Sequence, residues 1–244
     1  MAENEIIKHI KGAYTVTKSS GKSIRRKLYE IFIEIIIIVI AVSISIGLHN
    51  WNEKRHNKKE EKEFLLGMKK DLQIDIENMS SSMELYEYTL HGIAYFLKSG
   101  NAETLNQDSV MRYSDCFFSS TDLDPHIGRY EGLKGSGRFT IVENKDLLND
   151  LIELHESIIQ RIQDLNGKCY QHNQKIAALI SQNAILGKDG KVTNALSIAG
   201  RSDFKILIGT MRGLIENNII PIHKTGIAKC REIIAQVDKE LKGL

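Results

Sequence analysis

The sequence predicts an all-α protein: one N-terminal transmembrane helix, then an elongated antiparallel bundle of three long helices with a short helical insertion. Two observations favour this class. An apolar run extends from Ile31 to Leu48, and in three later stretches apolar residues recur three and four positions apart. With only two prolines in 244 residues and no clear strand-like alternation, long helices are expected. We expect a basic tail at 1–27, a transmembrane helix at 28–50 and a helical bundle domain at 51–244.

Residues 1–27 contain seven lysines or arginines and two short Ser/Gly runs. A cleavable signal peptide is not expected, because the basic region is long, the apolar segment exceeds the usual length and no Ala-x-Ala site follows. The positive-inside rule favours a cytoplasmic tail. An equally close basic cluster follows the apolar run (Lys54, Arg55, Lys58, Lys59 and Lys62), so the orientation stays open.

The apolar run has the length and composition of a membrane span. At ~1.5 Å rise per residue, roughly 18 to 21 helical residues cover the ~30 Å hydrocarbon core. A buried helix of a soluble domain would show a polar face, whereas this run contains only Glu34, Ser43 and Ser45 as polar residues. About thirteen strongly apolar residues, at roughly −0.3 to −0.6 kcal/mol each, outweigh the insertion cost of one glutamate.

Small and polar residues inside the span fall on two faces, and in lipid such faces are helix contacts. We expect a homo-oligomer in which Glu34 faces the interior or a water-filled path. The alternative is that Glu34 reaches the head groups beside Glu30. The predicted membrane-path or helix-contact residues are Glu34, Ala41, Ser43, Ser45 and Gly47. Trp51 is the predicted interface anchor, because an indole prefers the head-group layer of the bilayer.

Five segments carry a family resemblance: Glu34–Ile40, Asn50–Arg55, Glu63–Leu65, Lys69–Leu72 and Tyr130–Leu148. They resemble an uncharacterised family of bacterial single-pass membrane proteins with a Glu-Ile-x-x-(Ile/Val) span, an Asn-x-Trp-Asn-Glu motif and a Leu-x-x-Ser-Gly…Ile-x-Asn-x-x-Leu block. His155 stands where that pattern has a tyrosine. The resemblance covers residues 28 to 155 and implies a single-pass protein of the bacterial inner (cytoplasmic) membrane. It implies no activity.

Apolar stripes predict long helices at about 57–98, 144–186 and 202–242, and their narrow seam is typical of a coiled coil or elongated bundle. Asn144 is a candidate N-cap, and Pro221 is expected to kink or split the third helix. The stripe of the first helix contains Leu65, Met68, Leu72, Ile76, Met79, Met83, Tyr86, Leu90, Ile93 and Leu97. That of the third contains Phe204, Leu207, Met211, Leu214, Ile215, Ile219, Thr225, Ala228, Ile233, Val237 and Leu241.

The connection at 101–143 predicts a short helix at 105–118 and a candidate anion site. Backbone amides around two glycines, with flanking cations, can hold a phosphate or other anion. The alternative is a tight helix-to-helix turn with solvated cations. The candidate residues are Arg129, Lys134, Ser136 and Arg138, with Lys188, Lys191 and Arg201 near the other connection. The expected ligand is a small anion or a nucleic-acid oligomer, whose binding would weaken steeply with salt.

Catalytic, cofactor and metal motifs are not recognised in the sequence. Glu153 and His155 are two residues apart and cannot share a helix face, and Cys116, Cys169 and Cys230 lack ligand or disulfide spacing. A net charge of +2 is too small to indicate a partner. We therefore expect neither an enzyme, nor a cofactor, nor a metal.

Two functions remain. The first is a membrane effector or ion-channel-like subunit, plausible in bacterial anti-phage defence, whose helical domain senses a ligand or partner protein. The alternative is an envelope sensor or scaffold with an extracytoplasmic ligand-binding bundle.

Overall fold

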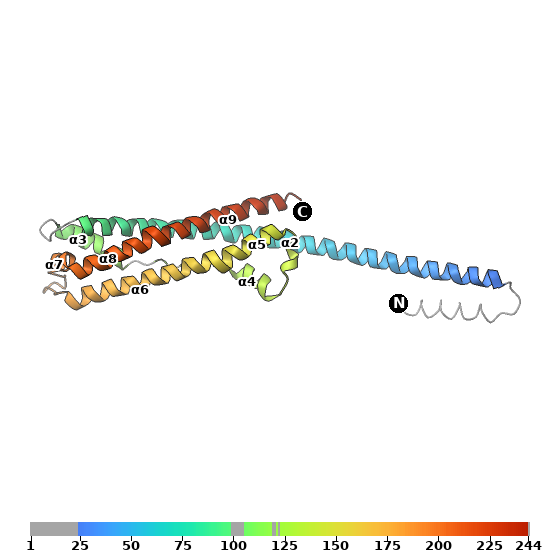
Figure 1. The fold of residues 1–244 in the computed structure, drawn as a ribbon, viewed down its shortest axis with the longest axis horizontal. Helices are drawn as coiled ribbons and strands as arrows, with labels where there is room; N and C mark the ends of the chain where they lie inside the picture. Colours follow the sequence, from blue (N-terminus) through green and yellow to red (C-terminus); the bar gives the residue numbers. More distant parts are fainter. Residues whose placement is uncertain (1–23, 99–104, 119–120, 122, 244) are drawn as a thin grey trace. The chain divides into compact units, whose positions relative to one another are not determined.

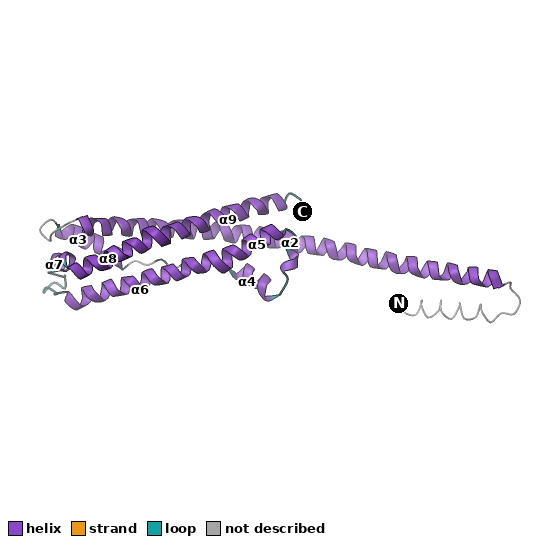
Figure 2. Ribbon diagram, in the orientation of Figure 1, coloured by secondary structure: helices purple, strands orange, loops and turns teal. Residues whose placement is uncertain are grey.

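The computed structural model describes residues 24–98, 105–118, 121 and 123–243. Residues 1–23 of the expected tail and residues 99–104 of the connection lie outside this set. The described residues form helices and loops without a strand, apart from an isolated bridge between Leu186 and Val192 (Figure 2). The prediction of an all-α protein with a long apolar N-terminal helix and a helical domain is confirmed.

The chain divides into two compact units, 1–60 and 61–244. Helix α2 (Ile24–Lys98) contributes to both (Figure 1). The expected transmembrane helix and first bundle helix are therefore segments of one helix. The sequence explains this continuity, because residues 49–62 contain no glycine or proline and are rich in Lys, Arg and Glu, which are good helix formers.

The second unit contains three long helical rods. The first is residues 61–98 of α2. The second is α5 (Lys145–Glu153), the π-helical turn η4 (Leu154–Ile159) and α6 (Gln160–Asn183). The third is α8 (Ser202–Leu214), the π-helical turn η5 (Ile215–Ile219) and α9 (Ile220–Glu240). The predicted helix ranges agree with these rods within a few residues, and Asn144 caps α5 by accepting hydrogen bonds from the backbone N–H groups of Asp146 and Leu147.

The rods do not alternate in direction throughout. The Glu143 N–H donates to the Glu61 carboxylate at 2.7 Å and the Tyr86 hydroxyl donates to Asn166 at 2.8 Å, so the first two rods run in the same direction. Lys69 pairs with Asp238 at 2.5 Å, so the third rod runs against the first. The prediction of an antiparallel bundle is therefore correct for the third rod, which runs against the other two. It is wrong for the first two rods, which run parallel to each other.

The long connection between the first two rods causes this arrangement. It contains α3 (Gln107–Ser114), the 3-10 turn η2 (Asp115–Phe117), α4 (Gly128–Gly135) and the 3-10 turn η3 (Phe139–Ile141). Thr121 donates to Tyr86 at 2.9 Å, and farther along the connection Arg129 pairs with Asp71 at 2.8 Å. The connection thus runs back along α2, and the second rod starts where the first one starts.

Two apolar clusters form the core of the second unit. One surrounds Leu72, Leu151 and Ile233, and the other surrounds Phe96 and Phe204. Every member of the predicted α2 stripe is buried or half-buried. Because burial of such a side chain contributes about 1.5–3 kcal/mol, these clusters stabilise the bundle.

The π turn η5 shifts the register of the third rod. Buried residues follow one another in steps of four from Met211 to Ile227, which would drift by about 160° around a straight α-helix. A π turn contains more residues per turn and cancels part of this drift. It ends two residues before Pro221, which lies in the first turn of α9, where its missing N–H donor is tolerated, so the rod continues rather than splitting. The predicted Ile233 and Val237 are buried, whereas the predicted Thr225 and Ala228 are exposed. The other buried residues of α9 are His223, Gly226, Ile227 and Cys230.

Gly226 lies where α9 meets the other two rods. A Cβ atom there would lie 2.8 Å from the Met79 sulfur and 3.1 Å from a methyl carbon of Ile162, and both side chains are fully buried.

Gly226→Ala is therefore expected to lower the free energy of unfolding by about 1–3 kcal/mol through overpacking. Gly209→Ala in α8 is the control, because open space surrounds its added Cβ. It should be neutral or stabilising by about 0.5–1 kcal/mol. Urea unfolding of the detergent-solubilised chain, followed by circular dichroism, measures both; equal effects would contradict the close packing.

Candidate functional site

The apolar segment of α2 lies uncovered in the first unit. Its large side chains from Leu28 to Leu48 are mostly exposed, for example Ile44 at 58% and Leu48 at 61%. Among the described residues, α2 is the one helix long and apolar enough to cross a membrane, and none of its apolar window is buried. A core helix of a soluble protein would be covered by its neighbours. The segment can therefore cross a membrane.

The candidate contact residues of the span lie on two faces of this helix. At about 100° per residue, Glu34, Ala41 and Ser45 fall within about 40° of one another, and Ser43 and Gly47 lie on nearly the opposite side. Glu34 is half-buried and the other four are exposed. A Cβ atom added at Gly47 would meet no other atom within 4 Å, so no contact within the described chain requires a glycine there. Contact with a second copy along either face stays a prediction.

Trp51 follows the apolar segment by one helical turn and is 62% exposed. An indole in this position can lie in the head-group layer. Its role as an interface anchor stays a prediction.

The cations of the candidate anion site have carboxylate partners within the bundle. Arg129 Nε lies 2.8 Å from Asp71 Oδ2, and Lys134 Nζ lies 2.6 Å from Glu156 Oε1. The Ser136 hydroxyl donates to the Leu133 carbonyl at 3.0 Å. An anion at this site would compete with the carboxylates of Asp71 and Glu156 for these cations. The anion site therefore stays a prediction.

The glycines beside these cations end α4 in a Schellman motif. Gly137 has φ +66°, and its N–H donates to the Lys134 carbonyl at 3.1 Å. The Arg138 N–H donates to the Leu133 carbonyl at 3.3 Å, which completes the pair of bonds typical of this motif. The tight turn, the alternative to the anion site, is therefore present.

A polar cluster surrounds Tyr130 on α4. Its ring stacks on His155 with centroids 4.3 Å apart, and its hydroxyl donates to Glu156 at 2.8 Å. Hydrogen bonds from Lys134 and Tyr130 lower the pKa of Glu156, while burial raises the pKa of Tyr130. Burial lowers the pKa of His155 to about 4, so this imidazole is neutral at pH 7. Hydrogen bonds from Tyr130 and Lys134 to Glu156 link α4 to the second rod, whereas both buried ring nitrogens of His155 have no hydrogen-bond partner among the described residues.

An apolar pocket of about 170 Å³ lies at the end of the bundle where α2 ends. It contains the rings of Phe96, Phe117 and Phe204, whose centroids are 5.5–5.6 Å apart. Other lining residues come from α3, α6 and α7 (Ala195–Gly200). Among the described lining residues Ser114 is the one polar residue, and its hydroxyl already donates to the Met111 carbonyl at 2.7 Å. An engineered apolar cavity of about 150 Å³ holds benzene, so this pocket suits a small uncharged molecule.

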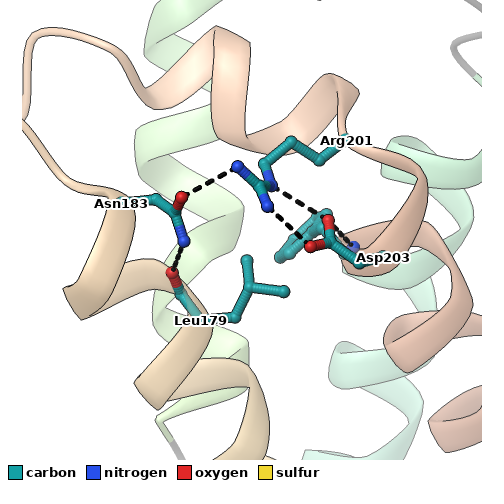
Figure 3. A network of polar contacts seen from close by, with 5 residues as sticks. Leu179, Asn183, Arg201 and Asp203 are labelled. Atoms are coloured by element: carbon teal, nitrogen blue, oxygen red, sulfur yellow. Dashed lines mark hydrogen bonds and ion pairs between the residues drawn. The ribbon is translucent and has the colours of Figure 1, made fainter.

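A hydrogen-bonded network lies next to Phe204, one of the residues that line this end pocket (Figure 3). The Arg201 guanidinium binds both carboxylate oxygens of Asp203, at 2.9 and 2.7 Å, and donates to Asn183 at 2.8 Å. Asn183 in turn donates to the Leu179 carbonyl at 2.8 Å. These bonds join the end of α6 to the start of α8, which carries Phe204. Arg201, a secondary candidate for anion binding, thus has a structural role.

Sequence reasoning missed the end pocket. Its lining residues are mostly apolar and are distributed along the sequence from Phe96 to Phe204, and each apolar residue by itself is predicted to belong to the core. No local spacing could have brought them together.

One comparison with known proteins gives a match. A family model described as a family of unknown function, DUF6090, matches residues 34–210, which is more than half of the chain. The chain belongs to the DUF6090 family. No curated protein and no solved structure matches it.

The DUF6090 match confirms the expected membership of an uncharacterised family. It begins at Glu34 and ends in α8, so it includes every candidate site residue and the whole lining of the end pocket, and it leaves out α9. The bacterial origin and the individual motifs stay predictions.

The three cysteines are buried and unpaired. Burial raises the pKa of Cys169 to about 11 and that of Cys116 and Cys230 to about 12. Among the described residues, no group of three His, Cys, Asp or Glu side chains could hold a metal ion.

The buried His155 predicts a pH-dependent stability. Its pKa of about 4 in the folded chain is lower than the unfolded value of about 6.5, so the unfolded chain binds more protons between these values. The contribution of the neutral His155 to the free energy of unfolding is therefore present above pH 6.5 and is lost as the pH falls towards 4. Between pH 7 and 5 this amounts to about 2 kcal/mol.

His155→Phe, which keeps a ring beside Tyr130, should therefore flatten the decline in the free energy of unfolding between pH 7 and 5. Urea titrations of the detergent-solubilised chain at several pH values measure it. His91→Gln, at an exposed position of α2, is the control and should keep the wild-type slope. An unchanged slope in His155→Phe would contradict the neutral buried imidazole.

Proposed function

We propose that this protein is a non-enzymatic, self-associating single-pass membrane protein of the bacterial inner membrane. In this proposal it acts as an effector or ion-channel-like subunit in anti-phage defence, and its bundle senses a ligand or partner protein. One observation carries the proposal: α2 supplies both the uncovered apolar segment and the core residues Leu65, Met68 and Leu72. A change of packing in the bundle therefore acts on the helix that enters the membrane.

The end pocket supports the sensing step. Phe96 of α2 lines this pocket, so a molecule bound there contacts the same helix that carries the span. A ligand shifts an equilibrium between two packings only if it binds one of them better. A small uncharged molecule that fits among Phe96, Phe117 and Phe204 would favour the packing with an open pocket.

The polar residues of the span support self-association. A glutamate within an apolar helix is costly towards lipid and favours the interior of a helix assembly. Ala41 and Ser45 on the same face allow close approach of helices. The polar cluster around Tyr130 supports the non-enzymatic part, because its groups bond to one another and its histidine is stacked and buried.

Ion flux tests the effector proposal. Purified protein in liposomes should release an entrapped ion, and Glu34→Leu or Ser45→Leu should change that flux about tenfold or more, because each removes a polar group from the proposed path. Val42→Leu adds bulk at an exposed position that lies about 60° or more from all five candidate residues around the helix axis, and it serves as the control. Flux that is absent under every ligand tested, or equal in all variants, would contradict the proposal.

The alternative is an envelope sensor or scaffold with its bundle outside the cytoplasm. The side of the bundle distinguishes the two, because the effector is expected to respond inside the infected cell. The native thiols are not expected to react with a thiol reagent in such a test, because they are buried and their raised pKa values keep them protonated.

Ser81→Cys places a thiol at an exposed position of α2 within the bundle. With an impermeant maleimide, the effector proposal expects labelling only after cell lysis, and the wild-type chain should stay unlabelled unless denatured. Labelling of Ser81→Cys in intact cells would favour the envelope sensor.

A further inference from the structure

Three cations gather around Trp51 on one side of α2. At about 100° per residue, Lys54, Arg55 and Lys58 all lie within about 60° of Trp51 around the helix axis. All four side chains are exposed. This basic face, defined here as Trp51, Lys54, Arg55 and Lys58, belongs entirely to the first unit.

Acidic residues of the same segment lie on the other side. Glu53 and Glu60 are about 160–180° away from Trp51 around the axis, and Glu60 pairs there with His56 at 3.2 Å. A helix that merely faces water usually mixes opposite charges at spacings of four, which stabilises it. Here the basic and the acidic side chains lie on opposite sides of the helix, so the basic face presents positive charge around the Trp51 ring.

The basic face begins in the lipid head-group layer at Trp51 and continues just beyond it. Lys54 and Arg55 follow Leu48 by roughly 9–10 Å of helix rise, and the head-group layer is about 5–8 Å thick on each side. Long basic side chains reach back towards that layer. Lys58 lies one turn farther out, within about one Debye length of it.

We propose that the basic face binds anionic phospholipid head groups of the leaflet at this end of the span. Charge complementarity and continuity with the apolar segment favour lipid over other anions. The indole fits the interface between chains and head groups, and the three cations bind the phosphates around it.

This binding surface does not compete with a helix contact along the Glu34 face, whereas Gly47 of the second candidate face lies only about 40° from Trp51 around the axis. Glu34, Ala41 and Ser45 lie about 100° away from Trp51 around the axis. Lipid binding would instead fix the rotation of the helix, so that the Glu34 face turns away from the bound head groups. The proposal needs no ion conduction, and its test is independent of flux.

Trp51 reports on the bound lipid directly, because it is the single tryptophan of the chain. The full-length protein is placed in vesicles containing phosphatidylcholine and one-fifth phosphatidylglycerol. In one sample the anionic lipid carries brominated chains, and in the other an equal fraction of phosphatidylcholine does. Bromine quenches tryptophan at contact, so enrichment of anionic lipid makes the first sample dimmer.

The expected result is about threefold enrichment of the anionic lipid around Trp51, which decreases at high salt. The triple variant Lys54→Gln, Arg55→Gln, Lys58→Gln should remove most of it. The matched control Lys145→Gln, Lys168→Gln, Lys175→Gln removes the same charge from exposed bundle positions and should keep it.

Equal quenching by the two lipids would overturn the proposal, as would enrichment that survives the triple variant. A response of Trp51 to a DNA oligonucleotide, without any lipid preference, would overturn it in favour of a nucleic-acid surface. Helicity measured by circular dichroism confirms that both triple variants are folded, and their exposed positions leave the core intact.

Discussion

The structure of this protein depends on how the apolar surface along α2 is covered. Its first unit carries a run of uncovered isoleucines, valines and leucines, and its second unit carries a stripe that the other rods bury. Water is a poor solvent for both surfaces. Lipid can cover the first and protein covers the second, so a single helix is adapted to two environments. The change occurs within residues 49–62, where charged residues keep the helix intact.

The polar groups of the bundle mainly hold its parts together. Asp71, Asp75 and Glu156 bind residues of the long connection, and Glu61 accepts a hydrogen bond from the residue that precedes Asn144. Burial raises the pKa of Asp75, while hydrogen bonds from the backbone and ring of His126 oppose that rise. The long connection is thus attached to α2 at several points along its length. The uncharged end pocket contrasts with this region.

Local features were predictable from the sequence. The buried face of α2, the cap at Asn144 and the turn at Gly137 each follow from a few neighbouring residues. The parallel course of the first two rods was not predictable, because it depends on pairings such as Tyr86 with Asn166 that lie far apart in the chain. The end pocket was hidden for the same reason. Thr225 and Ala228 were misplaced because a constant helical period was assumed through a π turn.

That π turn has a consequence for how the length of the third rod can vary. In η5 the rod accommodates more residues per turn than an α-helix, while the faces before and after it both stay against the core. Such a site absorbs the gain or loss of one residue, because the local winding can change without rotating the rest of the rod. We therefore expect length differences among related chains to be tolerated between Ile215 and Ile219 more readily than elsewhere in the third rod.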